Sequence, residues 1–142
     1  MRLGIRAILS MIMLAAIVAA QAPPTEYTPK FKGDPAKSDA EAAALGYLRT
    51  VVRAERYYNS KVGHYATSLK ELGGHGSFTK RMARTTDRGD YTVDFHGKKD
   101  GYLVALTPKQ FDDSHRAFYA KEDGKIRVEA GKPAGPASPV LR

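Results

Sequence analysis

Glutamate, tyrosine and histidine side chains gather in the stretch AERYYNSKVGHYATSLKEL, residues 54–72. Glu55 lies near Tyr58 on a predicted helix, and a carboxylate at a partly apolar face takes a raised pKa that suits a general base. The sequence contains no G-x-S-x-G nucleophile motif and no glycine-rich phosphate loop after a strand. We therefore interpret Glu55 as a helix-surface or salt-bridge residue and predict no catalytic residue. A hydrolase or metal-dependent enzyme that uses Glu55 and the histidines is a third hypothesis.

The histidines are the first candidates for metal ligands in this sequence. The chain has four histidines, none of which pairs with another at i, i+3 or i, i+4 spacing: His64, His75, His96 and His115. A preorganised metal site requires such spacing or a tertiary coincidence. We expect exposed loop histidines, and we predict no metal and no cofactor.

Three aspartates, Asp112, Asp113 and Asp123, carry the oxygen ligands that calcium prefers, provided that the fold brings them together between strands. They do not form the D-x-D-x-D-G loop of an EF-hand. Turn and solvation roles are the preferred interpretation, and calcium binding at this place stays an open alternative.

The segment TKRMARTTDR, residues 79–88, is the sharpest charge feature after the first twenty residues. It carries a single acidic residue, Asp87, against four cations: Lys80, Arg81, Arg84 and Arg88. The chain has a net charge of +8, and loss of residues 1–20, with Arg2 and Arg6 and no acidic residue, lowers it to +6. A solvated loop is the preferred interpretation. The alternative is a basic module that binds an anionic polymer, lipid or DNA through these four side chains.

Residues 1–20, MRLGIRAILSMIMLAAIVAA, have the layout of a secretory signal peptide, with two arginines before an apolar run. The run is shorter than the roughly 20 apolar residues of a stable membrane span. We predict cleavage after Ala20, which leaves Gln21 first; cleavage after Ala22 and an uncleaved anchor are alternatives. The protein is then exported to the periplasm, the cell envelope or the extracellular space. The chain has no cysteine, so its stability must come from packing.

The rest of the chain divides by composition into three parts. Residues 21–37 hold four prolines and one glycine, which favours an extended linker. Residues 38–130 form the predicted globular domain. Residues 131–142, GKPAGPASPVLR, read as a flexible tail without an expected small-molecule site.

The domain begins with a long predicted helix, from about Asp39 to about Ser60. Ser38 is a suitable N-cap, and Glu41, three residues later, completes a capping box. Apolar residues recur at helical spacing on one face, whereas three arginines share the opposite face. A short helical turn follows at Ser68–Leu72.

Beyond residue 90 the period of the apolar residues changes to two, which predicts strands. The predicted strands are YTVDF (91–95), GYLVAL (101–106), RAFYA (116–120) and IRV (126–128). Glycine-bearing hairpin loops join them in pairs. The fold class is therefore α+β, with one long N-terminal helix packed on a three- or four-stranded antiparallel meander. The residues to which we assign structural roles are Leu48, Val51, Tyr58, Gly63, Tyr65, Leu69, Tyr102 and Gly124.

The stretch LRTVVRAERYYNSKVGHYATSLKELG, residues 48–73, resembles the globular part of type IV pilins and of the major pseudopilin of type II secretion. Shared features are the Leu-Arg-Thr step, the Ala-Glu pair before a tyrosine, the Gly-x-Tyr turn and the Ser-Leu-x-x-Leu-Gly turn. Gly-Tyr at 101–102, Ala-Leu-Thr-Pro at 105–108, Arg-Ala-Phe-Tyr at 116–119 and Asp-Gly-Lys-Ile-Arg at 123–127 follow in the family's order. The resemblance implies a pilin-like fold over residues 39–128.

The same resemblance implies a non-enzymatic structural or adaptor role in the envelope, with envelope or type II secretion and type IV pilus proteins as partners. The sequence departs from the family at its start. Gly4 stands where a prepilin leader ends, but Leu9 occupies the fifth position after it instead of glutamate, and prolines 23, 24, 29 and 35 interrupt a continuous stem helix. The chain therefore lacks a usual prepilin leader.

Overall fold

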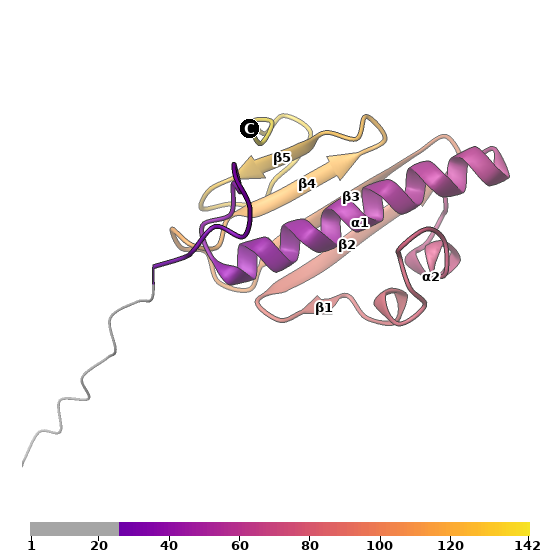
Figure 1. The fold of residues 1–142 in the computed structure, drawn as a ribbon. Coiled ribbons are helices and arrows are strands. Elements are labelled where there is room, and N and C mark those ends of the chain that lie inside the picture. Colours follow the sequence, from indigo (N-terminus) through magenta and orange to yellow (C-terminus); the bar gives the residue numbers. More distant parts are fainter. Residues whose placement is uncertain (1–25) are drawn as a thin grey trace, which may run out of the picture.

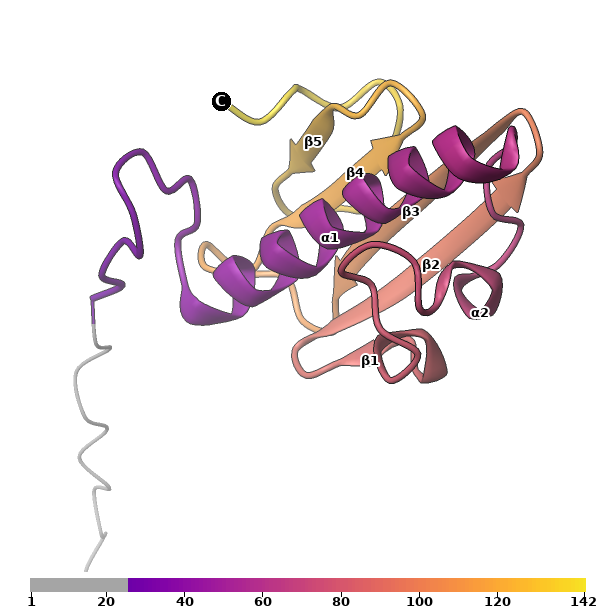
Figure 2. The same cartoon turned by 45° about the vertical axis from the view of Figure 1, so that its right-hand side comes forward.

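One long helix crosses one face of an antiparallel sheet in the computed structural model, which describes residues 26–142 (Figure 1). The predicted signal peptide and the first residues of the linker lie outside this range. The helix is α1 (Asp39–Val62), and the two views agree that it runs over the middle strands (Figure 2). Over residues 26–142, no helix combines the length and the apolar character that crossing a membrane requires.

The start of α1 follows from its capping residues. Ser38 is the N-cap, and its Oγ accepts a hydrogen bond of 3.1 Å from the backbone N–H of Glu41. The other half of the predicted capping box differs, since the Glu41 carboxylate accepts from the N–H of Lys37 and not from that of Ser38. Gly63 ends the helix with φ 87° and donates its N–H to the carbonyl of Asn59.

The sheet has five strands in the described part of the chain, in the order β1-β2-β3-β4-β5 with every neighbour antiparallel. The strands are β1 (Asp87–Arg88), β2 (Tyr91–Lys98), β3 (Gly101–Pro108), β4 (Ala117–Lys121) and β5 (Ile126–Glu129). The α+β class and the meander are confirmed, whereas the expected number of three or four strands is wrong. The additional strand is β1, whose two residues are too few to show a period of two.

The core lies between α1 and the sheet. Alternate residues of β2 and β3, such as Val93 and Val104, are buried against the helix, as their period of two predicted. Leu48 and Val51 of α1 are fully buried opposite them. The arginine-bearing face of α1 stays in contact with solvent. The helix is therefore amphipathic, with its apolar face toward the sheet as predicted.

Between α1 and β1 the chain makes an irregular connection that contains two short helices. These are α2 (Leu69–Leu72), which Ser68 caps, and the 3-10 helix η1 (Met82–Arg84). Both views place this connection beside α1, next to β1 (Figures 1 and 2). Leu69 and Leu72 are buried in the core, so α2 closes one side of it.

The two segments expected to be extended or flexible pack against the domain. In the linker, Tyr27 donates its hydroxyl to Asp34 at 2.5 Å, and Ala36 is buried. In the tail, the N–H of Val128 donates to the carbonyl of Pro139, and that of Leu141 donates to the carbonyl of Ile126. Residues 26–37 and 131–142 therefore make defined contacts with the domain. Composition alone did not reveal these long-range backbone contacts.

Candidate functional site

The basic segment forms part of a cavity of about 490 Å³ between α2 and η1. Lys80 and Arg84 line it from the η1 side, and Lys70 lines it from α2. Sequence reasoning named Lys80 and Arg84 but missed Lys70, which lies ten residues earlier and outside the charged run. Only the packing of α2 against η1 brings these three side chains to one cavity.

That packing depends on Gly73, at the end of α2. A Cβ atom at this position would lie 2.9 Å from the Cβ of Ala83 and 3.4 Å from the Cα of Lys80. Real Cβ atoms do not approach another carbon to 2.9 Å, whereas 3.4 Å is an ordinary contact, so a side chain here would force Gly73 and Ala83 apart. Gly73 and Ala83 thus form the floor where the two walls of the cavity meet.

The charges around this cavity are not neutralised by neighbouring carboxylates. None of the ion pairs within residues 26–142 involves Lys70, Lys80 or Arg84. The adjacent acids are engaged elsewhere, because Glu71 accepts hydrogen bonds from Tyr58 and Thr67, and Asp87 pairs with Lys109 at 3.1 Å. The cavity is therefore an electropositive concavity.

The other two predicted anion-binding residues do not line this cavity. Arg81 is exposed at the N-terminal end of η1. Arg88 is half-buried on β1, where its guanidinium lies 4.2 Å from the centroid of the Tyr47 ring and donates to the carbonyl of Met82. Because the Arg88 guanidinium already interacts with an aromatic ring and a carbonyl of the same protein, we assign Arg88 a structural role.

Two of the histidines meet on one tyrosine. The ring of Tyr58 makes edge contacts with His64 and His75, with centroid distances of 5.8 and 4.8 Å. Nδ1 of His64 lies 2.9 Å from the carbonyl oxygen of Tyr65. The Tyr58 hydroxyl donates to Glu71, and this bond is the main reason that the pKa of Glu71 falls to about 2. The cluster joins the end of α1 to the connection around α2.

Glu55, the residue considered as a general base, is fully buried. Its Oε2 accepts a 3.0 Å hydrogen bond from the N–H of Ala66, and its Oε1 has no partner in the part of the chain that the structure describes. Burial raises the pKa of Glu55 to about 7, and the nearby carboxylate of Glu71 adds to this shift. The expectation of a helix-surface or salt-bridge role for Glu55 is therefore wrong.

The segment that Glu55 holds is also pressed against the sheet. A Cβ atom at Gly97 of β2 would lie 2.2 Å from the carbonyl oxygen of Ala66, so only glycine admits this contact. Ala66 is thus fixed by α1 through its N–H and by β2 through its carbonyl side. The fully buried Glu55 side chain thus holds the connection in place through Ala66.

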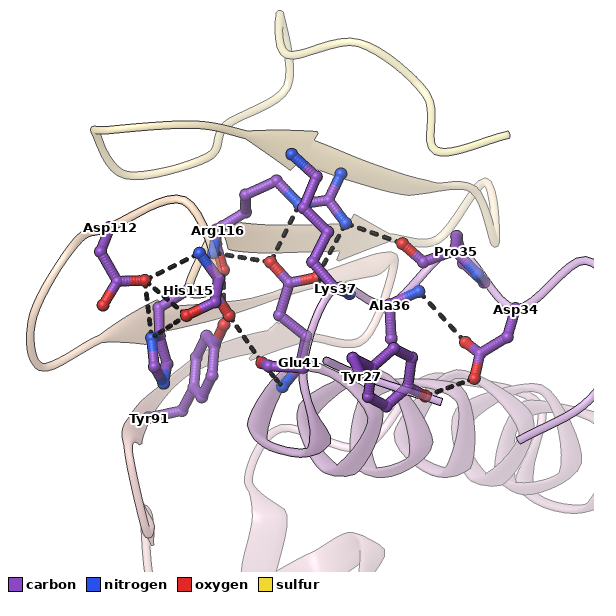
Figure 3. A network of polar contacts seen from close by, with 12 residues as sticks. Tyr27, Asp34, Pro35, Ala36, Lys37, Glu41, Tyr91, Asp112, His115 and Arg116 are labelled. Carbon is purple, nitrogen blue, oxygen red and sulfur yellow. Dashed lines mark hydrogen bonds and ion pairs between the residues drawn. The ribbon is translucent and has the colours of Figure 1, made fainter. Parts of the chain in front are cut away.

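A second polar network joins the start of α1 to the loop before β4 (Figure 3). Glu41 is fully buried, and its carboxylate accepts from the backbone N–H, Nε and Nη2 of Arg116 at 2.8–2.9 Å. Arg116 also donates to the carbonyl of Pro35 at 2.8 Å, which fixes the linker. Residue types and spacing do not indicate this pair, because the two residues are distant in the chain and each has an ordinary local role.

His115 extends this network toward the surface (Figure 3). Its Nδ1 lies 2.8 Å from Oδ1 of Asp112, and its Nε2 lies 3.2 Å from Oδ2 of Asp90. The hydrogen bond with Asp112 is the largest cause of a raised pKa of His115, and the same bond lowers the pKa of Asp112 to about 2. Next to it, the Tyr91 hydroxyl donates to the carbonyl of Arg116.

The aspartates considered for calcium do not meet. Asp112 and Asp113 precede β4 and Asp123 follows it, so the length of that strand separates them. Asp123 is paired with Arg127 at 2.7 Å, and His96 pairs with Asp94 on β2. Within residues 26–142 no group of three or more histidine, aspartate or glutamate side chains is arranged to hold a metal ion. The alternative of a calcium site formed by these three aspartates is therefore corrected.

Comparison with known proteins returned no significant match, whether to a protein-family model, to a curated sequence or to a solved structure.

Proposed function

We propose that this chain is an exported, non-enzymatic, pilin-like domain with a structural or adaptor role in the cell envelope, associated with type II secretion or type IV pili. The observation that carries this proposal is the position of the residues that resemble the pilin and pseudopilin pattern. Gly63 ends α1, Ser68 caps α2, Gly101 opens β3, Pro108 closes it, and Gly124 forms the turn between β4 and β5. The short motifs thus stand at the boundaries of a helix-and-meander fold in the order that the family has.

The use of the polar residues supports a structural role. Glu41, Glu55 and His115, whose side-chain types are those of catalytic sites, each bind another part of the same chain. Their contacts connect α1 to the loop before β4 and to the connection around α2. Such contacts make a small cysteine-free domain rigid, as an adaptor between envelope components requires.

The start of the helix favours an adaptor over a filament subunit with a continuous stem. The chain before Ser38 folds back, since Lys30 pairs with Asp39 at 2.8 Å and Pro35 accepts from Arg116. A stem helix would instead continue from α1 toward the N-terminus without a cap. The described part of the linker therefore packs against the first turn of α1.

The test is cross-linking in intact cells that produce the protein, combined with N-terminal sequencing of the protein recovered from them. We expect a mature N-terminus at Gln21 and cross-links to an envelope protein of a secretion or pilus assembly. A mature start at Ile5 would indicate a filament subunit. Recovery of a monomer without any cross-linked envelope partner would contradict the adaptor role.

A second candidate function is a basic envelope module, which the electropositive cavity between α2 and η1 favours. It predicts that the full chain binds anionic vesicles, an anionic polymer or DNA with an affinity that falls steeply as salt rises. Neutralising Lys80, Arg81 and Arg84 should remove this binding, with Arg88 left unchanged because it is held over Tyr47. Binding that is unchanged in this variant, or that does not depend on salt, would exclude the second candidate.

A further inference from the structure

The cavity between α2 and η1 has the dimensions of a small-molecule site. Its volume of about 490 Å³ lies within the range of roughly 300–1,000 Å³ that ligand pockets occupy. Three cations line it, while its floor is formed by Gly73 and Ala83, which present no polar side chain. A ligand that enters it therefore meets positive charge on two walls and small groups below.

We infer that this cavity binds a phosphate monoester, as a soluble phosphorylated compound or as the terminal phosphate of a lipid headgroup. A phosphate monoester carries about −1.5 to −2 charges near neutral pH, which the three positive charges of Lys70, Lys80 and Arg84 offset better than they would offset a single carboxylate. The planar guanidinium of Arg84 donates two parallel hydrogen bonds to phosphate oxygens, and the lysines supply mobile ammonium groups.

The shape of the site favours a compact ligand over a polymer. A protein that binds an anionic polymer presents a row of cations along the path of the polymer backbone. Arg88, which would extend the row toward β1, is held over Tyr47 and bound to Met82. The cations that line the cavity come from two segments that face one concavity. This inference rests on the second candidate function and limits its anionic ligand to a phosphate monoester. It does not depend on the pilin-like assignment.

The first experiment measures binding of sn-glycerol 3-phosphate and of inorganic phosphate to the full chain by calorimetry. The cavity variant carries Lys70→Gln, Lys80→Gln and Arg84→Gln. The matched control carries Lys32→Gln, Lys125→Gln and Lys132→Gln, three exposed lysines away from the cavity, so that both variants lose the same charge. We expect the cavity variant to bind glycerol 3-phosphate at least about tenfold more weakly, and the control to bind like the unchanged protein. Equal weakening in both variants, or no binding to the unchanged protein, overturns the inference.

A second variant tests the cavity without a change of charge. Gly73→Ala places a methyl group against Ala83 and moves the two walls apart. We expect weaker binding of glycerol 3-phosphate with an unchanged salt-dependent attraction to DNA. Normal binding of glycerol 3-phosphate by this variant, with its far-UV circular dichroism unchanged, would show that the cavity is not the site.

Vesicles distinguish the two sources of the phosphate. Vesicles of phosphatidylcholine with phosphatidic acid present a monoester, whereas those with phosphatidylglycerol at equal surface charge present a diester. If glycerol 3-phosphate binds, retention on the phosphatidic acid vesicles alone identifies a lipid headgroup, and no retention on either vesicle identifies a soluble ligand. Equal retention on both vesicles without binding of glycerol 3-phosphate overturns the inference but leaves the basic-module function standing.

Discussion

Glu41 and Arg116 form a buried ion pair in which Nη2 of the arginine lies 2.8 Å from Oε2 of the glutamate. The Glu41 side chain is fully buried, and that of Arg116 is 13% exposed. The pair fixes the first turn of α1 to the residue that precedes β4, and through Pro35 it also fixes the linker. One contact therefore sets the position of the helix, the sheet and the N-terminal segment together.

Glu41→Gln should destabilise the domain by about 3 kcal/mol, because it leaves the guanidinium of Arg116 buried without its counter-charge. Chemical denaturation of the full chain measures this loss. A second substitution, Arg116→Met, should cost less in the Glu41→Gln background than in the unchanged protein, because the unpaired charge is then removed.

The matched control is the exposed ion pair between Lys30 and Asp39, whose side chains are 57% and 85% exposed. Asp39→Asn should cost less than about 1 kcal/mol, since exposed pairs contribute little. Equal losses for Asp39→Asn and Glu41→Gln would contradict the role assigned to the buried pair.

Glu55 should make the domain less stable as pH rises. Its pKa is about 7 in the folded protein against an ordinary value of 4.5, so the folded state binds more protons between these two values. The destabilisation is absent below about pH 4.5, grows as pH rises and is complete above about pH 7, at a magnitude on the order of 3 kcal/mol. Glu55→Gln keeps the acceptor for Ala66 and cannot ionise.

The measurement compares the free energy of unfolding of Glu55→Gln and the unchanged protein at several pH values. The variant should be more stable at pH 8 and equally stable at pH 4. Taking the difference between the two proteins removes the contributions of groups that do not interact with Glu55, such as His115. Glu71, Tyr58 and Tyr102 do interact with Glu55. The pKa of Glu71 is lowered to about 2 by its bond with Tyr58, the same bond raises the pKa of Tyr58, and burial raises that of Tyr102, so in the folded protein none of the three titrates between pH 4 and pH 8. A difference that does not change with pH would show that the pKa of Glu55 is the same in the folded and the unfolded protein, which would contradict the raised value.

Tyr58→Phe should raise the pKa of Glu71 from about 2 toward 4.5, because the Tyr58 hydroxyl is its principal donor. The lost hydrogen bond should also cost about 1 kcal/mol of stability. Since the pKa of Glu71 is lowered in the folded state, this contribution is present above pH 4.5 and disappears as pH falls through about 2. NMR titration of the carboxyl carbon and thermal unfolding measure both effects. Tyr57→Phe, at an exposed neighbouring tyrosine, should leave both quantities unchanged.

Asp112→Asn should lower the pKa of His115 toward 6.5, because the bond with Asp112 is the main cause of its elevation. A raised histidine pKa stabilises the fold below pH 6.5, and this stabilisation is lost as pH rises through the folded-state pKa. NMR titration of the imidazole protons tests the shift. Asp113→Asn removes an exposed carboxylate that makes no bond to His115, so an equal shift in that variant would refute the assignment to Asp112.

The regular elements were accessible to sequence reasoning because their signals are local. Ser38 and Glu41 located the start of α1, and the alternation of apolar residues located β2 and β3. Each of these signals depends on neighbours within one or two turns of helix or on a period of two along a strand. By contrast, β1 was missed because a strand of two residues has no period.

Long-range contacts were not accessible in this way. The order of the tail along β5 depends on backbone bonds from Val128 and Leu141, and such bonds leave no mark in composition. Glu55 was interpreted as a surface residue because it is charged, although its spacing from Val51, Val52 and Tyr58 places it on the buried face of α1. Its bond with the N–H of Ala66, and the close contact of Gly97 with Ala66, had no signal in the sequence.

The sequence by itself determined the amphipathic helix, the four longer strands and their antiparallel connections, because hydrophobic period and capping act locally. Only the tertiary structure decided which cations share a cavity. Lys70 joins Lys80 and Arg84 because Gly73 lets α2 approach η1, whereas Arg88 is withdrawn onto Tyr47. The physical reason is that the position of a charge relative to another charge depends on the packing of whole segments, and residue types and spacing do not specify that packing.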